Sequence, residues 1–180
     1  MHWLLDDIRE TVHLSVLDGE QVMCIDKLDS PEPVRAYSEI GRKAPAYCIA
    51  TGKVLLAWRE LYQPSLHLVN SKREAFTAAT ITNVAEMVKK LARIRSQGYA
   101  VNRGEWRARV WGVAAPITDG TGRVMAAIGV SGPARRIKQA GIRSMEKEVT
   151  EAARRITNNM AGKDAALHSC ATRHKESTEI

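Results

Sequence analysis

The sequence has few of the features that mark membrane-spanning, secreted or disulfide-stabilised proteins. Its 180 residues contain no apolar run long enough for a transmembrane helix, which needs about 20 apolar residues in succession. The first ten residues include Asp6 and Asp7 and lack the apolar core of a secretory signal. Its cysteines, Cys24, Cys48 and Cys170, are odd in number and far apart. This argues against a disulfide framework and indicates a cytoplasmic protein.

Aromatic residues are also scarce, and this bears on how the positive charge is interpreted. The chain has 27 Lys and Arg, 20 Asp and Glu and a single Phe, for a net charge of +7. The basic residues form scattered pairs and no stripe interleaved with aromatics, so a solvated basic surface is favoured over a nucleic-acid site. Direct DNA binding stays an alternative, which predicts an affinity that falls steeply with salt.

What the sequence does contain is an alternation of helices and β-hairpins. Asp18-Gly19 and the segment 119–122 each lie between two β-rich runs and indicate tight turns. The pattern predicts strands at 11–17, 21–28, 34–38, 99–103, 110–117 and 123–131, and helices at 3–10, 46–58, 60–76, 82–98 and 142–160. Hairpins around central helices favour an α+β fold with an antiparallel sheet. The domain is expected to span 11–162, followed by a disordered tail at 163–180.

The stretch RKAPAYCIATGKVLL, residues 42–56, carries the most conspicuous local motif. Its Gly-Lys pair lacks the earlier glycine and the following Ser or Thr of a phosphate loop. A close-packing Gly52 beside an exposed Lys53 is the simpler interpretation. Cys48, near a helix start, is either a nucleophile or a small buried hydrophobe. No histidine or carboxylate grouping supports a metal site or a cofactor.

The two late strands predict a sheet face of unusually small residues. If the turn at 119–122 joins them as a hairpin, paired residue numbers add up to about 241. One face then carries Gly112, Ala114, Ala127, Gly129 and Ser131, and the other carries Val113, Ile117, Val124, Ile128 and Val130. The small-residue face either takes a closely packed helix or leaves room for a ligand. The polar loop 102–111 beside it favours a small-molecule pocket.

These landmarks, in this order and spacing, resemble the C-terminal effector-binding domain of IclR-family transcriptional regulators. The resemblance covers about residues 11–160 and rests on TVHLSVLDGEQVMCIDKLDSPEPVR, GRKAPAYCIATGKVLLA, FTAATIT, IRSQGYAVNRGEW and VAAPITDGTGRVMAAIGVSGP. It implies a GAF-like domain with a curved antiparallel sheet flanked by helices. Residues 1–10 would then be the end of a linker helix. DNA would be bound only by a separate N-terminal winged helix-turn-helix domain, which this chain lacks.

The resemblance also implies an effector site and a self-associating protein. The expected partners are a small carboxylate or aromatic effector and further copies of the chain, as a homodimer or a dimer of dimers (homotetramer). The candidate effector-binding residues are Ala50, Thr51, Asn102, Glu105, Trp106, Arg107, Arg109, Gly112, Gly129 and Ser131. Gly112 and Gly129 replace larger residues of small-acid-binding members, which predicts a larger effector, with Arg107 or Arg109 pairing its carboxylate. Arg42 and Lys43 are expected at the pocket rim or a subunit contact. The alternative is a GAF-like enzyme with Cys48 as its nucleophile.

Overall fold

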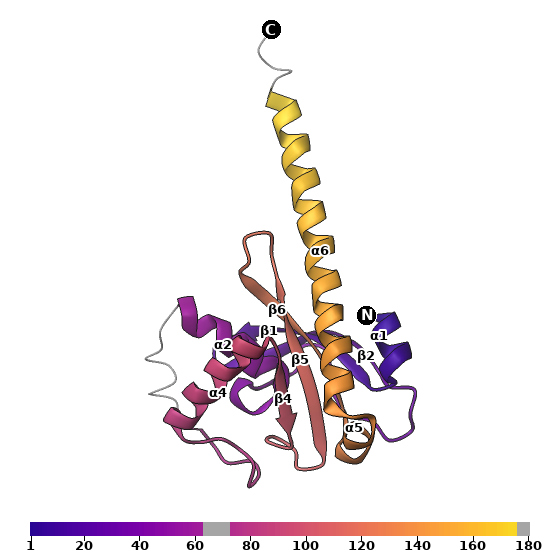
Figure 1. Cartoon of the computed structure of the whole chain (residues 1–180), viewed down its shortest axis with the longest axis vertical. Coiled ribbons are helices and arrows are strands. Elements are labelled where there is room, and N and C mark those ends of the chain that lie inside the picture. Colours follow the sequence, from indigo (N-terminus) through magenta and orange to yellow (C-terminus); the bar gives the residue numbers. More distant parts are fainter. Residues whose placement is uncertain (63–72, 176–180) are drawn as a thin grey trace.

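The computed structural model describes residues 1–62 and 73–175 and shows one antiparallel sheet between two layers of helices (Figure 1). The strands, in the spatial order β3-β2-β1-β6-β5-β4, are β1 (Thr11–Asp18), β2 (Gln21–Leu28), β3 (Lys43–Pro45), β4 (Ala100–Arg103), β5 (Val110–Thr118) and β6 (Val124–Pro133). The helices are α1 (His2–Ile8), the 3₁₀ turn η1 (Ala46–Cys48), α2 (Ala50–Tyr62), α4 (Val84–Gln97), α5 (Ala134–Ala140) and α6 (Ile142–Lys175). The predicted α+β class with a curved antiparallel sheet is confirmed.

Local sequence signals account for the ends of several elements. Gly19 has a φ of 62° in the turn between β1 and β2. The Asn83 side chain caps α4 by accepting a hydrogen bond of 3.0 Å from the Glu86 amide. Gly98, with a φ of 81°, ends the same helix in the left-handed conformation that glycine adopts without strain. The predicted hairpin and the limits of α4 are therefore confirmed.

The pairing of β5 with β6 differs from the predicted register by two residues. Gly112 lies opposite Ser131 and Ala114 opposite Gly129, so that paired numbers add up to 243 along most of the ladder. A bulge next to Ile117 accounts for one residue of this offset, and the turn accounts for the other, since Thr118 pairs with Val124. Because the offset is even, each side chain keeps its predicted face, except for Val124, which the bulge places on the α2 side of the sheet.

The two faces of the sheet carry separate hydrophobic cores. On the small-residue face, Ala114 and Ala127 pack against α2 and α4. On the other face, Val113, Ile128 and Val130 pack against α1, α5 and α6. The sheet is thus buried on both sides, and its small-residue face takes a closely packed helix over part of its area.

The segment before β3 departs from the prediction. Residues 34–38 form no strand; the edge strand of the sheet is β3, which pairs with β2. Pro31 and Pro33 lack the amide hydrogens of a regular ladder, and the chain instead crosses the sheet face as an irregular segment. Most of the helix predicted at 60–76 lies outside the described residues.

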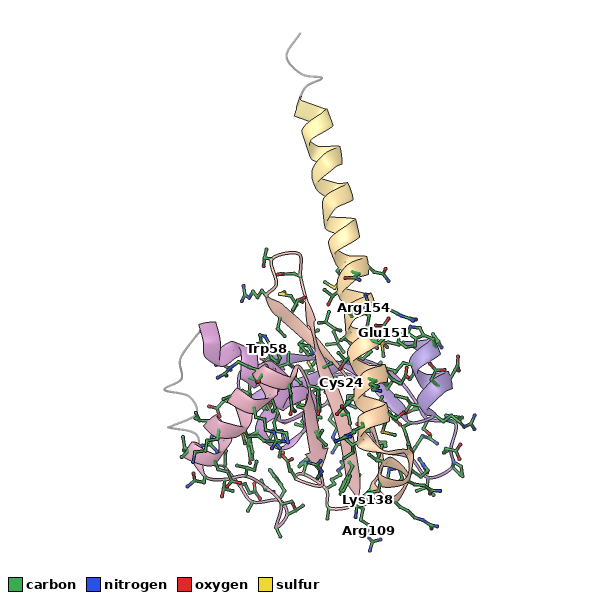
Figure 2. All side chains as sticks on the ribbon, in the orientation of Figure 1. Cys24, Trp58, Arg109, Lys138, Glu151 and Arg154 are labelled. Carbon is green, nitrogen blue, oxygen red and sulfur yellow. The ribbon has the colours of Figure 1, made fainter. Side chains whose placement is uncertain are left out.

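Helix α6 extends well beyond the body of the domain (Figure 1). It continues to Lys175, through most of the segment predicted to be a disordered tail; residues 163–175 contain no Gly or Pro to end it. Along its first half it holds α1: Arg155 lies 4.4 Å from the Trp3 ring centroid and pairs with Glu151 at 2.8 Å. Glu151 is labelled on this helix in Figure 2. Among the described helices, none is both long and apolar enough to span a membrane.

Candidate functional site

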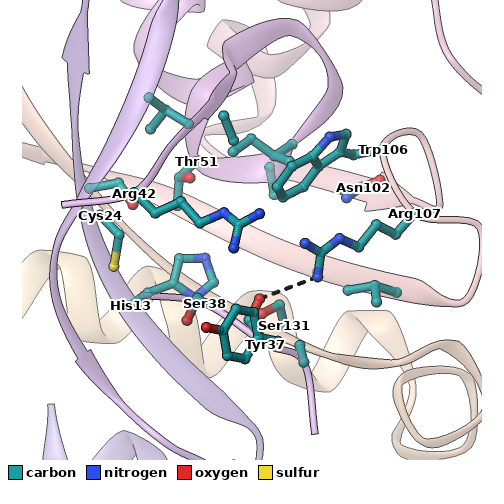
Figure 3. Close-up of a pocket in the computed structure, with 18 of the residues that line it drawn as sticks. His13, Cys24, Tyr37, Ser38, Arg42, Thr51, Asn102, Trp106, Arg107 and Ser131 are labelled. Carbon is teal, nitrogen blue, oxygen red and sulfur yellow. Dashed lines mark hydrogen bonds between the residues drawn. The ribbon is translucent and has the colours of Figure 1, made fainter. Parts of the chain in front are cut away.

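A cavity of about 100 Å³ lies on the small-residue face of the sheet, beside the start of α2. Strands β1, β2, β5 and β6 provide its floor, and the first residues of α2 close one side. The irregular segment 36–42 and the loop after β4 close the others (Figure 3). The floor exists because glycine, alanine and serine on these strands leave space that larger side chains would occupy.

Seven of the ten predicted site residues line this cavity: Ala50, Thr51, Asn102, Trp106, Arg107, Gly112 and Ser131. They come from α2, β4, the following loop, β5 and β6, which the sheet order brings together. Ser131 pairs with Gly112, and Gly112 pairs with Asn102, so these three lie in one row across the floor. Glu105, Arg109 and Gly129 do not line the cavity.

Gly129 lies beneath Thr51, not beside open space. A Cβ built on Gly129 would come within 2.8 Å of the γ-methyl of Thr51. The small residue therefore makes room for the helix residue above it, and Thr51 fills the volume that Gly129 was expected to add to the cavity. Close helix packing explains Gly129, whereas Gly112 lies at the cavity floor.

Glu105 is turned away from the cavity and forms a buried ion pair with Lys53. The Lys53 side chain is fully buried, which corrects the prediction of an exposed lysine. Its ammonium also donates to the Val101 carbonyl at 2.9 Å. Burial lowers the pKa of Lys53 to about 8, and Glu105 opposes this by favouring the charged form. Gly52 is close-packed as predicted, since a Cβ there would overlap the Ala46 backbone.

Arg109 lies at the edge of the molecule and is exposed (Figure 2). The nearby Trp111 packs with the core on the opposite face of the sheet, and Lys138 lies 5.1 Å from its ring centroid. Of the two arginines considered for a carboxylate, only Arg107 is therefore at the cavity.

The charged groups at the cavity are Arg107, Arg42 and Glu39. The Arg107 guanidinium lies 4.5 Å from the centroid of the Trp106 ring and donates to the Tyr37 carbonyl at 3.5 Å. Arg42 pairs with Glu39 at 3.5 Å, whereas Arg107 has no carboxylate partner within the described part of the chain. Figure 3 shows the two guanidinium groups facing each other across the cavity. The cavity therefore carries one uncompensated positive charge.

Three polar atoms buried at the cavity have no hydrogen-bonding partner among the described residues: Nδ1 of His13, Oγ of Ser38 and Oγ1 of Thr51. Burial lowers the pKa of His13 to about 4, so its imidazole is neutral near pH 7. Buried polar groups are nearly always hydrogen-bonded, so a cluster of three marks a site that lacks its partner.

Several lining residues were not among the predicted site: His13, Cys24, Tyr37, Ser38 and Glu39. Tyr37 and Ser38 were assigned to a strand at 34–38, and nothing in their local pattern shows that they cover the sheet. His13 could have been predicted from the sequence, because two polar residues, His13 and Ser15, lie on the same face of a strand. Arg42 lines the cavity, as expected for a rim residue, while Lys43 pairs with Asp18 at 2.6 Å.

The geometry of Cys48 opposes the nucleophile hypothesis. Its side chain is fully buried, and its Sγ donates to the Pro45 carbonyl at 3.3 Å. Burial, aided by the negative charge of Glu105, raises the pKa of the Cys48 thiol to about 12. The thiolate needed for nucleophilic attack is therefore disfavoured. In the described ranges, no group of three His, Cys, Asp or Glu residues is placed to hold a metal ion.

Comparison with known proteins agrees with this architecture. Residues 1–158 match the family model described as the bacterial transcriptional regulator IclR C-terminal domain. The chain is 34% identical over 156 residues to the transcriptional regulator KdgR of Escherichia coli, covering 87% of this chain and 59% of KdgR.

Solved structures show the same fold. The C-terminal domain of E. coli KdgR superposes with a TM-score of 0.79 at 32% identity, over 89% of this chain and 93% of that one. An IclR homologue from Microbacterium hydrocarbonoxydans complexed with 4-hydroxybenzoate gives a TM-score of 0.78 at 24% identity, over 89% of this chain and 64% of that one. The chain belongs to the IclR family of bacterial transcriptional regulators and corresponds to their C-terminal domain.

Proposed function

We propose that this chain is a ligand-sensing domain that binds a small organic carboxylate in the cavity between α2 and the sheet. The observation that carries the proposal is Arg107, a cavity-lining cation without a carboxylate partner in the described residues. Its guanidinium is stacked on Trp106, which fixes its orientation. A carboxylate placed there would pair with Arg107 and relieve the repulsion from Arg42 across the cavity.

The size of the cavity limits the effector. A dry cavity of about 150 Å³ accommodates benzene. The volume of about 100 Å³ here is smaller, so the effector is expected to be compact: a short chain fits directly, and a substituted ring requires segment 36–42 to move outward. Trp106 and the apolar walls favour an aromatic or aliphatic body behind the carboxylate. The homologue complexed with 4-hydroxybenzoate shares the fold and supports benzoates as first probes.

The regulatory role would be to couple this cavity to DNA binding by a separate N-terminal domain. The chain spans 59% of the length of KdgR. Binding to an operator by a further domain is therefore part of this proposal for the whole protein. Coupling between an effector site and a DNA site is typically worth about 1–3 kcal/mol. A homodimer or dimer of dimers is part of the same proposal, and native mass spectrometry with and without ligand measures it.

The test compares two arginines that differ in position but not in charge. A thermal-shift and calorimetric screen of aromatic and aliphatic carboxylates should find ligands of the unmodified chain. Arg107→Met should weaken the best ligand about 10- to 100-fold, because a charge-assisted hydrogen bond is lost. Arg109→Met removes the same charge at an exposed site and should leave the affinity unchanged. Equal losses in both variants, or no carboxylate ligand at all, would refute the proposal.

A further inference from the structure

The three unpartnered atoms of His13, Ser38 and Thr51 come from three separate elements that meet only in the folded chain. His13 belongs to β1, Ser38 to the irregular segment before β3, and Thr51 to the first turn of α2. Thr51 is the most enclosed of the three, with 1% of its surface exposed. An unpaired hydroxyl at such a position is unfavourable in the empty domain.

The sheet register places His13 and Thr51 next to each other. Gly129 lies directly opposite His13 in the ladder between β1 and β6. The γ-methyl of Thr51 lies over Gly129, 2.8 Å from the position of a Cβ there. Since directly opposed residues have Cβ positions about 4.5–5.5 Å apart, Thr51 stands beside His13 on the cavity floor. Ser38 lines the same cavity as His13 (Figure 3).

Segment 36–42 is fixed in this place by hydrogen bonds that leave the Ser38 hydroxyl unused. The Lys27 ammonium donates to the Ser38 carbonyl at 2.8 Å, and the Thr11 hydroxyl donates to the Ala36 carbonyl at 3.4 Å. These two backbone carbonyls are thus paired, while the Ser38 side chain lines the cavity. The folded chain itself brings the three groups together.

The chemistry of the three groups differs from that of the arginine side of the cavity. Two hydroxyls and one neutral imidazole both donate and accept hydrogen bonds, and none carries a charge. A carboxylate only accepts hydrogen bonds and gains more from Arg107. A hydroxyl group both donates and accepts, so it satisfies such a cluster.

We propose that His13, Ser38 and Thr51 form a subsite for a hydroxyl group, so that the domain selects hydroxylated carboxylates over the same acids without the hydroxyl. This inference rests on the proposed binding of a carboxylate at Arg107. Sites built to hydrogen-bond a hydroxyl discriminate strongly against analogues that lack it, because their buried polar groups then stay unpaired.

The experiment measures dissociation constants by calorimetry for matched acids. The probes are benzoate, 3- and 4-hydroxybenzoate, 3- and 4-methylbenzoate, hexanoate, 6-hydroxyhexanoate and heptanoate. At least one hydroxylated acid should bind about tenfold or more tightly than both its unsubstituted and its methyl counterpart. If the acids bind but the hydroxyl gives no gain, the subsite is wrong and the carboxylate proposal stands. If no acid binds, both fail.

Variants assign the selectivity to the cluster. Thr51→Val replaces the hydroxyl by a methyl and keeps the γ-methyl over Gly129, so the packing is preserved. Thr51→Val should reduce the preference for the hydroxylated acid to about threefold or less. Ser38→Ala removes a second hydroxyl of the subsite, on a surface segment, and should reduce the same preference. Thr51→Ser keeps the hydroxyl and should retain most of the preference. A preference unchanged in both Thr51→Val and Ser38→Ala would overturn the inference.

Discussion

At the scale of single residues, the size of the side chain at position 129 limits the size of the side chain at position 51. The contact between the Thr51 methyl and the Cα of Gly129 lets α2 approach the sheet, and it also removes Gly129 from the cavity surface. A larger residue at position 129 would therefore need a smaller one at position 51.

Introducing Ser at position 129 alone should therefore destabilise the domain. Gly129→Ser places a Cβ 2.8 Å from the Thr51 methyl, and overpacking of this kind costs about 1–3 kcal/mol. The added change Thr51→Ala should recover part of the loss, so that the two changes are coupled by about 1 kcal/mol in a double-mutant cycle. Urea unfolding of the four proteins measures this; purely additive effects would contradict the contact.

His13 should make stability depend on pH. Burial lowers its pKa from 6.5 to about 4 in the folded chain. Between these values the unfolded chain binds a proton that the folded chain does not, so the free energy of unfolding falls as the pH drops from 6.5 to 4. Above that range the contribution is constant.

The variant His13→Gln cannot titrate and serves as the comparison. The unmodified chain should lose about 2 kcal/mol more stability than this variant between neutral pH and about pH 4.5. Urea unfolding at both pH values provides the measurement. Parallel losses in the two proteins would show that His13 is not buried as a neutral imidazole.

At the scale of elements, the Lys53–Glu105 pair connects α2 to the loop that carries Trp106 and Arg107. The loop is also held by its own hydrogen bonds: the Glu105 amide donates to Oδ1 of Asn102 at 2.8 Å, and the Thr80 hydroxyl donates to the Glu105 carbonyl at 2.5 Å. Glu105 thus positions the cavity residues on either side of it without reaching the cavity itself.

Breaking this pair should be costly, whereas removing both charges should not. Lys53→Met leaves the buried Glu105 carboxylate without its partner and should destabilise the domain by about 3–5 kcal/mol. Adding Glu105→Leu should restore most of the stability. Lys89→Met, at an exposed position of α4, is the control and should change stability by less than about 0.5 kcal/mol. A double variant no more stable than Lys53→Met would contradict this account.

At the scale of the whole molecule, one segment of the chain contacts both the cavity and the end of α1. Segment 30–39 contributes to the cavity wall, and it also holds the junction between α1 and β1. The Ser30 hydroxyl donates to the Arg9 carbonyl at 2.6 Å, and Arg9 pairs with Glu32 at 2.9 Å. Because α1 is the part of the domain nearest to the N-terminus, ordering of this segment by a ligand would reach the position from which a preceding domain would extend.

Hydrogen exchange with and without a bound carboxylate tests this connection. Ligand binding should slow amide exchange in residues 36–42, which line the cavity, and also at Arg9, Glu10 and Thr11. The turn at 119–123, on the far end of the β5–β6 hairpin, should not change. Protection confined to 36–42 would mean that the segment closes on the ligand without affecting α1.

Much of the fold was predictable because it depends on local chemistry. The Asp18-Gly19 turn and the limits of α4 were assigned correctly, as were the faces of β5 and β6 apart from that of Val124. The errors concern the pairing of strands. A bulge altered the hairpin register, and residues 34–38 crossed the sheet instead of joining it. Helix α6 continues into the segment expected to be a tail, where no Gly or Pro ends it.

The sequence by itself determined the α+β class, the small-residue sheet face and the family, because periodicity, turn residues and ordered landmarks are properties of short segments. Only the tertiary structure decided which of the candidate residues share a cavity. It brought His13 and Ser38 to Thr51, separated Arg107 from Arg109, and buried Lys53 against Glu105. These relations join residues far apart in the chain, and their energies depend on desolvation that exists only after the layers have packed.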